Sequence, residues 1–499
     1  MAQKYDLPFK LDDPSILHFD SFVNNEWKPA SSGGRFEVID PATTTPWTSI
    51  PTNTATDISS YTHSASTAFS TFRTTTARHR AQLLQNWDTQ IRTHRTDLAR
   101  ILVHETGKPL AEALGEIDYA LTFTWWFVGE PERISGSITP AAIPGRRILT
   151  VKQPIGVVAA LVPWNFPVAM VVRKAAAAFA AGCTMIVKPS PETPVSALVL
   201  GELAKRAGFP AGVLNVITTD LENTPAVSEA LCRDPAVRKV TFTGSTRVGK
   251  LVAGYCAPGL KKMTLELGGN CPFLVFDDAD LNQALEMLMA LKWRHAGQAC
   301  ITANRVYVQS GVYDKFVGML KERTERQIRV GNGWEDGVTM GALTTPQGVE
   351  KALQQVQDAT AKGATVVLGG DKVPGTGYFF QPTILRDMTA DMRVSSEESF
   401  APIAALYRFE TEEEAVARAN DTAMGLASYA FTKNADRLWR LFENLEAGMI
   451  GLNTGSSSAA EAPFGGVKES GYGKESGKEV AVNEYLVTKT GTLTVDGHY

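Results

Sequence analysis

Cysteine and histidine are scarce in this sequence, and their spacing excludes several classes of protein. Five cysteines stand among 499 residues, an odd number, and no two of them form a CxxC pair. A disulfide framework and the common zinc knuckles are therefore excluded, and a reducing compartment fits best. The seven histidines are scattered and form no HExxH pair, so the sequence predicts no metal site.

The sequence also lacks a charge imbalance and an uninterrupted apolar run of membrane length. Lys and Arg number 49 against 53 Asp and Glu, a net charge of −4, and no segment is strongly basic. Nucleic acid is therefore not an expected partner. The apolar run over 155–172 contains Pro163, Asn165 and Pro167, so we interpret it as a buried strand, a turn and a helix start. Because no signal peptide is evident, we expect a soluble, cytoplasmic protein that contacts no membrane.

Apolar runs alternate with helical segments along most of the chain, whose length suits about two to four domains. The first 60 residues predict strands and hairpins, and 61–128 predicts helices. The β-rich runs beyond them are 156–162, 184–189, 213–217, 237–242, 273–276, 305–309, 365–367 and 449–453. The helical segments between the first four runs are 168–181, 194–208 and 224–233. This alternation predicts two α/β domains with parallel sheets. The stretch 483–495 alternates with period two and needs a partner strand, which another subunit could supply.

The segment FTGSTRVGK (242–250) follows a predicted strand and opens a predicted helix. Glycines let the backbone approach a ligand closely, and a helix N-terminus attracts phosphate. The dinucleotide fingerprint GxGxxG does not fit, because Ser245 and Thr246 follow Gly244. The P-loop pattern fails at Leu251, where the magnesium-binding hydroxyl belongs. Taken by itself, the segment fits a plain strand–turn–helix equally well.

Three further residues stand in contexts that favour chemistry. Cys300 follows Gly297, which can end a helix and expose the thiol, although a lone cysteine is more often a small buried side chain. Glu266 precedes a Gly-Gly pair, where a carboxylate can act as a general base or simply face solvent. Asn165 stands between two prolines, and its amide can stabilise an oxyanion or merely complete a turn.

Seven motifs in order together resemble the aldehyde dehydrogenase superfamily. They are PWNFP (163–167), KPSPETP (188–194), FTGSTRVG (242–249), LELGG (265–269), GQAC (297–300), EESFAP (397–402) and PFGGVKESGYG (463–473). The resemblance covers nearly the whole chain and is strongest to succinate-semialdehyde dehydrogenases. It implies an α/β fold with a Rossmann-type cofactor domain, an α/β catalytic domain and a small β oligomerisation arm. The implied cofactor domain spans 1–128 and 147–266. The implied catalytic domain spans 267–460, and the implied oligomerisation arm spans 129–146 and 480–499.

The resemblance also implies a role for each matching residue. Cys300 would be the nucleophile, Asn165 and the Cys300 backbone N–H would hold the oxyanion, and Glu266 would activate water. The residues that would contact the cofactor, NAD or NADP, are Trp164, Lys188, Pro191, Gly244, Ser245, Glu398 and Phe400. Pro191 stands where NAD-preferring relatives often carry Glu, so we expect NADP to be accepted at least as well as NAD. Thr302 replaces the second cysteine of some relatives, which excludes a disulfide switch there.

The substrate positions point to an aldehyde with a distal carboxylate. Arg173 and Arg294 match two arginines that bind this carboxylate in succinate-semialdehyde dehydrogenases, and Ser458 would add a hydroxyl. Trp126 and Phe464 would line the tunnel. The expected reaction is the NAD(P)-dependent oxidation of succinate semialdehyde to succinate, through a thiohemiacetal and a thioester that water hydrolyses.

Alternatives stay open at this stage. The substrate could be another small aldehyde, such as glutarate semialdehyde or an aromatic aldehyde. The chain could also be a non-catalytic protein of the same fold. A further alternative is a P-loop NTPase, although Leu251 stands where the magnesium-binding hydroxyl of that class belongs. The resemblance further implies a homo-oligomer, dimer or tetramer, joined through the arm.

Overall fold

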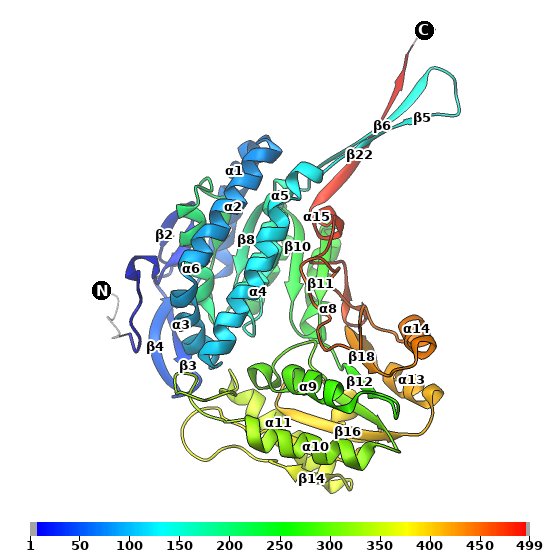
Figure 1. Cartoon of the computed structure of the whole chain (residues 1–499). Helices are drawn as coiled ribbons and strands as arrows, with labels where there is room; N and C mark the ends of the chain where they lie inside the picture. Colours follow the sequence, from blue (N-terminus) through cyan, green and yellow to red (C-terminus); the bar gives the residue numbers. More distant parts are fainter. Residues whose placement is uncertain (1–6, 496–499) are drawn as a thin grey trace.

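A sheet of eight strands forms the larger half of the protein (Figure 1). The computed structural model describes residues 7–495; residues 1–6 and 496–499, which the predicted domains include, lie outside this range. The strand order is β2-β1-β9-β8-β7-β10-β11-β21. The bounds are β1 Ser21–Val23, β2 Glu26–Lys28, β7 Val157–Leu161, β8 Thr184–Lys188, β9 Leu214–Val216, β10 Val237–Thr243, β11 Lys262–Glu266 and β21 Gly471–Tyr472. The five central strands, β9 to β11, are parallel, which confirms the predicted βαβ units.

Helices cover both faces of this sheet. Their bounds are α1 Ile58–Phe72, α2 Ala77–Thr93, α3 Arg95–Thr106, α4 Leu110–Val128, α5 Pro167–Ala181, α6 Pro194–Arg206, α7 Thr224–Arg233 and α8 Thr246–Cys256. One face packs against α5 and α6, with α2, α3 and α4 outside them, and the other packs against α1, α7 and α8. A separate apolar core fills each side.

A second sheet of seven strands forms the other half, with order β14-β15-β16-β13-β12-β18-β19. The bounds are β12 Pro272–Val275, β13 Arg305–Gln309, β14 Thr365–Leu368, β15 Thr383–Arg386, β16 Ile403–Phe409, β18 Ala427–Phe431 and β19 Met449–Leu452. All neighbours are parallel except β14 and β15. The helices of this half are α9 Leu281–Lys292, α10 Tyr313–Gln327, α11 Pro346–Ala361, α12 Arg393–Ser396, α13 Glu412–Asn420 and α14 Ala435–Asn444.

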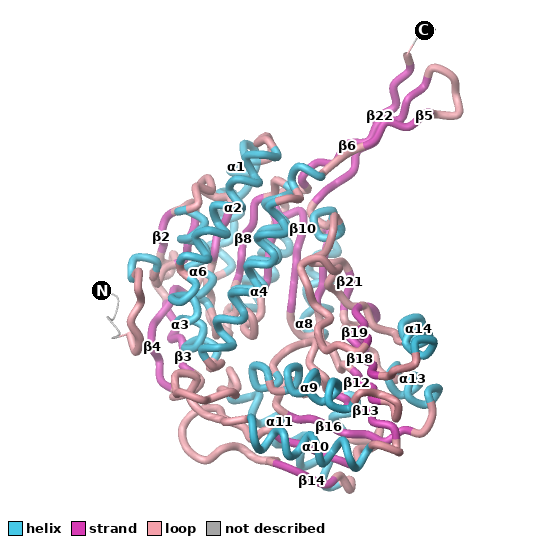
Figure 2. Tube along the Cα trace, viewed as in Figure 1, coloured by secondary structure: helices cyan, strands magenta, loops and turns pink. Residues whose placement is uncertain are grey.

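A three-stranded arm projects from the eight-stranded half (Figure 2). Its strands are β5 Ser137–Pro140, β6 Arg146–Pro154 and β22 Leu486–Thr494. The C-terminal strand thus finds its partner within its own chain, since β22 pairs with β6 along its whole length. Strand β6 belongs to the arm sheet, although most of it falls in the range 147–266 that the sequence analysis placed in the cofactor domain. The division into domains itself stays a prediction.

Short elements complete the chain. They are β3 Arg35–Asp40 with β4 Thr45–Pro51, β17 Met424–Gly425 with β20 Val467–Lys468, α15 Val480–Asn483, and the 3-10 turns η1 Pro14–Ile16, η2 Ala55–Asp57, η3 Pro131–Arg133, η4 Ala257–Gly259 and η5 Arg294–Gly297. Within residues 7–495, no helix is both long and apolar enough to cross a membrane. The same part of the chain contains no cluster of three or more acidic, cysteine or histidine side chains that could hold a metal ion.

Helix α5 is buried along its whole length, and it carries two charged side chains. All 15 of its residues are buried, and its alanine-rich surface lets the neighbouring elements approach closely. Pro167 starts the helix, and Gly182 ends it in the left-handed conformation that glycine adopts without strain. Two cations, Arg173 and Lys174, lie in the middle of this buried helix, and burial of a charge requires a partner.

Candidate active site

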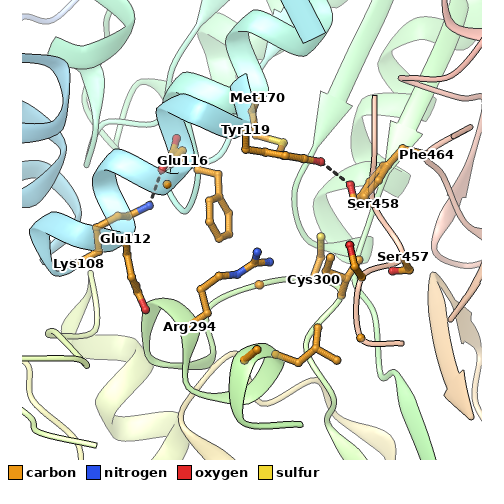
Figure 3. A pocket seen from close by; sticks show the side chains of 18 of the residues that line it. Lys108, Glu112, Glu116, Tyr119, Met170, Arg294, Cys300, Ser457, Ser458 and Phe464 are labelled. Carbon is orange, nitrogen blue, oxygen red and sulfur yellow. Dashed lines mark hydrogen bonds and ion pairs between the residues drawn. The ribbon is translucent and has the colours of Figure 1, made fainter. Parts of the chain in front are cut away.

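A cavity of about 500 Å³ lies between the two halves of the protein (Figure 3). Its lining includes Glu112, Tyr119, Phe166, Met170, Arg173, Arg294, Cys300, Ser458 and Phe464. Phe166 and Met170 in its lining follow the carboxyl end of β7, the kind of place where parallel α/β sheets bind their ligands. Most of the lining is apolar, so a few polar groups determine how a ligand lies in it.

Cys300 lies at this cavity because the chain turns sharply after α9. The helix ends at Lys292 and a 3-10 turn, Arg294–Gly297, follows. Gly297 has a φ of +74°, and a Cβ there would lie 2.2 Å from the Ala401 carbonyl oxygen. Desolvation, and then the charge of Glu398, raise the pKa of the Cys300 thiol to about 12. The nucleophile predicted from the sequence is therefore a neutral thiol at pH 7 in the free protein.

Asn165 is held against the loop that carries Cys300. Its Nδ2 donates a hydrogen bond of 2.9 Å to the carbonyl of Gln298, two residues before the cysteine. Gln298 is itself fixed, because its Oε1 accepts from the backbone N–H of Thr344 at 2.9 Å. This contact uses one of the two N–H groups of the Asn165 amide, so the other can donate to a ligand.

Glu266 ends β11 and is almost completely buried. Both of its carboxylate oxygens are buried without a hydrogen-bond partner among the described residues. Burial, followed by the charge of Glu475, raises its pKa well above the ordinary value, against the opposing effect of Arg173 and Lys174. A buried carboxyl group with a raised pKa and free oxygens has the properties of a general base.

Glu475 is the partner of the two buried cations of α5. Arg173 lies 2.7 Å from one carboxylate oxygen, and Lys174 donates to the other. Thr241 on β10 adds a hydrogen bond of 2.9 Å. Burial alone would raise the pKa of Glu475, but Lys174 and Arg173 lower it to about 2. The charge of Arg173 is thus largely compensated within the protein. Of the guanidinium nitrogens of Arg173, only Nη1 has no hydrogen-bond partner among the described residues.

Arg294 is the less constrained of the two predicted carboxylate ligands. Its guanidinium extends into the cavity toward Cys300 and lies 5.2 Å from the centre of the Phe166 ring (Figure 3). Within the described part of the chain it forms neither an ion pair nor a hydrogen bond. Opposite it, the Ser458 hydroxyl forms a short hydrogen bond with Tyr119. Arg294 therefore presents an unpaired positive charge to a ligand.

The predicted placement of Trp126 is wrong, because this side chain does not line the cavity. It packs instead against the core of the eight-stranded half. On α4 the cavity-lining side chains are those of Glu112, Glu116 and Tyr119. Trp126 lies on the same helical face as Tyr119 but seven residues further on, about 10 Å along the axis. Phe464, the other predicted tunnel residue, does line the cavity.

Most of the predicted cofactor residues follow or end strands β7, β8 and β10 of the eight-stranded sheet, whereas Glu398 and Phe400 precede β16 of the other sheet. Gly244 and Ser245 form the turn between β10 and α8, and Ser245 caps the helix by accepting from the Val248 N–H. A Cβ at Gly249 would lie 2.4 Å from the end of the Leu267 side chain, so the glycine lets α8 pack closely against this residue. The free N–H groups at the start of α8 are suited to phosphate oxygens.

The remaining predicted cofactor residues supply a cation, a carboxyl group and an aromatic pair. Lys188 ends β8, and its buried ammonium has one hydrogen bond of 3.3 Å, to Thr224. Glu398 accepts from the Gly269 N–H at 3.1 Å, and desolvation raises its pKa to about 7. The rings of Phe400 and Trp164 meet edge to face at 5.5 Å. Together with the start of α8, this donor and acceptor set fits a dinucleotide.

Pro191 lies between two residues that interact with each other. Ser190 donates a short hydrogen bond to Glu192, so an acidic side chain is present one position after the proline. Glu192 also acts on Lys188, where its charge opposes the effect of burial, which lowers the pKa of the lysine to about 8. No sequence pattern indicated a role for this carboxylate.

Comparison with known proteins agrees with this geometry. The chain belongs to the aldehyde dehydrogenase family, which it matches over residues 27–491. It is 46% identical to a succinate-semialdehyde dehydrogenase (NADP(+)) of Escherichia coli strain K12, over 96% of this chain and 98% of that protein. It is also 46% identical to a glutarate-semialdehyde dehydrogenase of Pseudomonas aeruginosa, with the same coverage. The crystal structure of an NADP-dependent enzyme from E. coli superimposes with a TM-score of 0.95 at 46% identity, covering 97% of this chain and 100% of that one.

Proposed function

We propose that the protein is an NAD(P)-dependent dehydrogenase that oxidises succinate semialdehyde to succinate. The observation that carries the proposal is the unpaired guanidinium of Arg294 in the same cavity as the Cys300 thiol. An aldehyde with a carboxylate at its far end would lose hydration on entering this mostly apolar cavity, and a fixed cation offsets that loss. The relatives that act on semialdehydes point in the same direction.

In the proposed reaction each residue has one task. Cys300, once deprotonated, attacks the aldehyde carbon to form a thiohemiacetal, whose oxyanion receives hydrogen bonds from the Asn165 amide and the Cys300 N–H. A bound nicotinamide would accept the hydride, which leaves a thioester on Cys300. Glu266 then takes a proton from water, and the resulting hydroxide releases the acid and restores the thiol. Glu398 and Phe400 would hold the nicotinamide end, and Lys188 with the start of α8 would hold the ribose and phosphates.

Replacement of Arg294 tests the substrate class. We expect Arg294→Gln to lower kcat/KM for succinate semialdehyde by about 10- to 150-fold, the equivalent of about 1.5–3 kcal/mol for a hydrogen bond to a charged group. Butanal has no carboxylate and should lose little. Arg326→Gln, at an exposed arginine on α10, is the matched control and should change neither value. An equal loss for both aldehydes would contradict the carboxylate role.

Arg173→Gln should behave differently from Arg294→Gln. Its loss removes one of the two cations that neutralise the buried Glu475, next to Glu266. We therefore expect kcat/KM to fall for butanal as well as for succinate semialdehyde, together with a lower Tm. Thermal unfolding and the same two-substrate assay measure this. A loss confined to the anionic aldehyde would mean that Nη1 of Arg173 contributes mainly to substrate binding.

Glutarate semialdehyde is the second candidate substrate. A cavity of about 500 Å³ holds far more than the seven non-hydrogen atoms of succinate semialdehyde, since one water occupies roughly 30 Å³ in the liquid. One additional methylene can therefore be accommodated. A series of ω-oxo acids of increasing length, compared by kcat/KM, identifies the preferred one.

For the cofactor we propose that NADP is accepted at least as well as NAD. Pro191 cannot repel a 2′-phosphate, and the Lys188 ammonium has protons free for it. Comparison of kcat/KM for the two cofactors tests this. A strong preference for NAD would implicate Glu192, which could accept from a ribose hydroxyl in place of Ser190. Glu192→Gln should then restore the use of NADP.

We also propose that the arm joins subunits into a homo-oligomer. Ile138 and Leu493 on its surface are 72% and 51% exposed, which is unusual for large apolar side chains in a monomer. A cytoplasmic location is proposed on the five free cysteines. The predicted domains would be one cofactor-binding unit around the eight-stranded sheet and one catalytic unit around the seven-stranded sheet.

A further inference from the structure

Lys108 and Glu116 form a buried ion pair beside Asn165 that no sequence motif indicated. Nζ of Lys108 lies 2.5 Å from Oε2 of Glu116, and the two side chains are 1% and 0% exposed (Figure 3). Lys108 follows Gly107, the left-handed residue that ends α3, and Glu116 lies on α4. A buried ion pair adds little net stability compared with apolar side chains, so its presence calls for another explanation.

Glu116 supplies the N-terminal cap that α5 lacks. No side chain next to the start of α5 accepts a hydrogen bond from its first turn. Instead, Oε1 of Glu116 accepts from the N–H groups of Val168 and Ala169, at 2.9 and 3.2 Å. A carboxylate at a helix N-terminus satisfies free N–H groups and interacts favourably with the helix dipole. Glu116 thereby fixes the start of α5, directly after Asn165.

Lys108 connects this cap to Asn165 itself. Its ammonium donates to the Asn165 carbonyl at 2.9 Å as well as to Glu116, and it lies 4.5 Å from the centre of the Phe166 ring. The side chain of Asn165 is held on the other side by Gln298. The backbone and the amide of Asn165 are thus fixed from opposite directions, one by the eight-stranded half and one by the Cys300 loop.

We propose that Lys108, with Glu116 as its counter-ion, is a positioning residue that orients the Asn165 amide toward the oxyanion. Lys108 touches neither the reacting atoms nor the cofactor residues, and it acts through Asn165. An oxyanion donor must be held within a fraction of an ångström to be effective, and the hydrogen bond from Lys108 to the Asn165 carbonyl, anchored by the ion pair with Glu116, supplies that restraint. The inference rests on the proposed function, because it gives Lys108 a role only where Asn165 stabilises an oxyanion.

Direct binding of a substrate carboxylate by Lys108 is the competing explanation, since this residue also borders the cavity. The geometry argues against it: the ammonium already has two oxygen acceptors and one aromatic face. The two roles differ in substrate dependence. Every aldehyde forms the oxyanion, whereas only an anionic aldehyde has a carboxylate for Lys108.

The test is a double-mutant cycle between Lys108→Met and Asn165→Ala. Enzyme in excess over butanal, with saturating NADP, reports only the steps up to hydride transfer through the absorbance of NADPH. Loss of an oxyanion donor slows turnover by about 10²–10³-fold, so we expect Asn165→Ala to fall in that range and Lys108→Met to lose about 10- to 100-fold. The double variant should be no slower than Asn165→Ala, because Lys108 acts only through the amide.

Glu105→Gln is the matched control. Glu105 is another buried carboxylate, and it caps α6 by accepting from Val195 and Ser196 just as Glu116 caps α5. Its replacement should lower the Tm without slowing the single turnover at saturating cofactor. Should Lys108→Met fail to fold, the variant Lys108→Met with Glu116→Gln leaves no unpaired charge and enters the same cycle.

Four results would overturn the inference. Equal slowing by Lys108→Met with and without Asn165→Ala would mean a general structural effect. Slowing confined to succinate semialdehyde would mean substrate binding. Wild-type rates in Asn165→Ala would mean that the Asn165 amide is not needed, so Lys108 could not act by positioning it. Aldehyde oxidation, and with it the proposed function, would be unaffected by that result. A wild-type protein that oxidises no aldehyde would instead refute the proposed function, and the inference with it.

Discussion

Cys300→Ser should abolish turnover, with a loss in kcat of more than about 10⁴-fold, as replacement of an enzyme nucleophile commonly gives. The pKa of the Cys300 thiol is already raised to about 12, and a hydroxyl, which ionises still less readily, supplies no useful nucleophile at neutral pH. Formation of NADPH from succinate semialdehyde, followed by absorbance, measures the loss. The serine is nearly isosteric, so Tm and cofactor affinity should not change.

Cys183→Ser is the control for the first prediction. This thiol is buried and donates to the Tyr485 carbonyl, a hydrogen bond that a serine hydroxyl can replace. It lies far from the cavity, so the variant should keep wild-type turnover. Substantial dehydrogenase activity in Cys300→Ser would disprove the cysteine mechanism.

Glu266→Gln should leave hydride transfer fast and block the later hydrolysis of the thioester. Glutamine keeps the shape of the side chain but cannot take a proton from water, so the thioester on Cys300 should persist. Rapid mixing should show a burst of NADPH close to one equivalent per site, followed by turnover slowed by about 10²–10⁴-fold, the usual contribution of a general base. Added hydroxylamine, which attacks a thioester without a base, should restore turnover and yield the hydroxamate.

The wild-type enzyme should show the same base in its pH profile. Because the pKa of Glu266 is raised well above its ordinary value, the carboxylate form is lost at a higher pH than in an exposed glutamate. A general base acts only when deprotonated, so deacylation should slow as the pH falls, starting at a higher pH than for an exposed glutamate, and Glu266→Gln should lack this dependence. Absence of both burst and turnover in Glu266→Gln would mean that Glu266 is needed earlier, to deprotonate the thiol.

Local patterns in the sequence predicted the parallel strands correctly, and they singled out three chemical residues whose roles stay predictions. Cys300, Asn165 and Glu266 each follow or end a strand or helix where glycine or proline dictates the backbone, and such signals are short-range. The turn at Gly297 is an example. Its positive φ and the lack of space for a Cβ both require glycine, so the residue type alone indicates the turn.

Pairings between distant residues were beyond these patterns. Nothing in the neighbourhood of Arg173 indicates that Glu475 neutralises it, so the sequence suggested a free cation. Lys108 and Glu116 lie only eight residues apart in the sequence. Their contacts with the start of α5 are visible only in the folded structure. Trp126 was placed at the tunnel by the family resemblance alone, and the resemblance did not show how far along α4 the cavity reaches.

The pairing of Arg173 with Glu475 also determines when α5 can be buried during synthesis at the ribosome. The two residues are 302 positions apart, so at the usual 5–20 residues per second the anion is made about 15–60 s after the cations of α5. During that interval the nascent chain cannot bury α5 without leaving two charges unpaired. The eight-stranded half therefore stays incomplete until the last stretch of the chain is translated, and a nascent polypeptide truncated before Glu475 should remain a substrate for chaperones rather than an aldehyde-oxidising fragment.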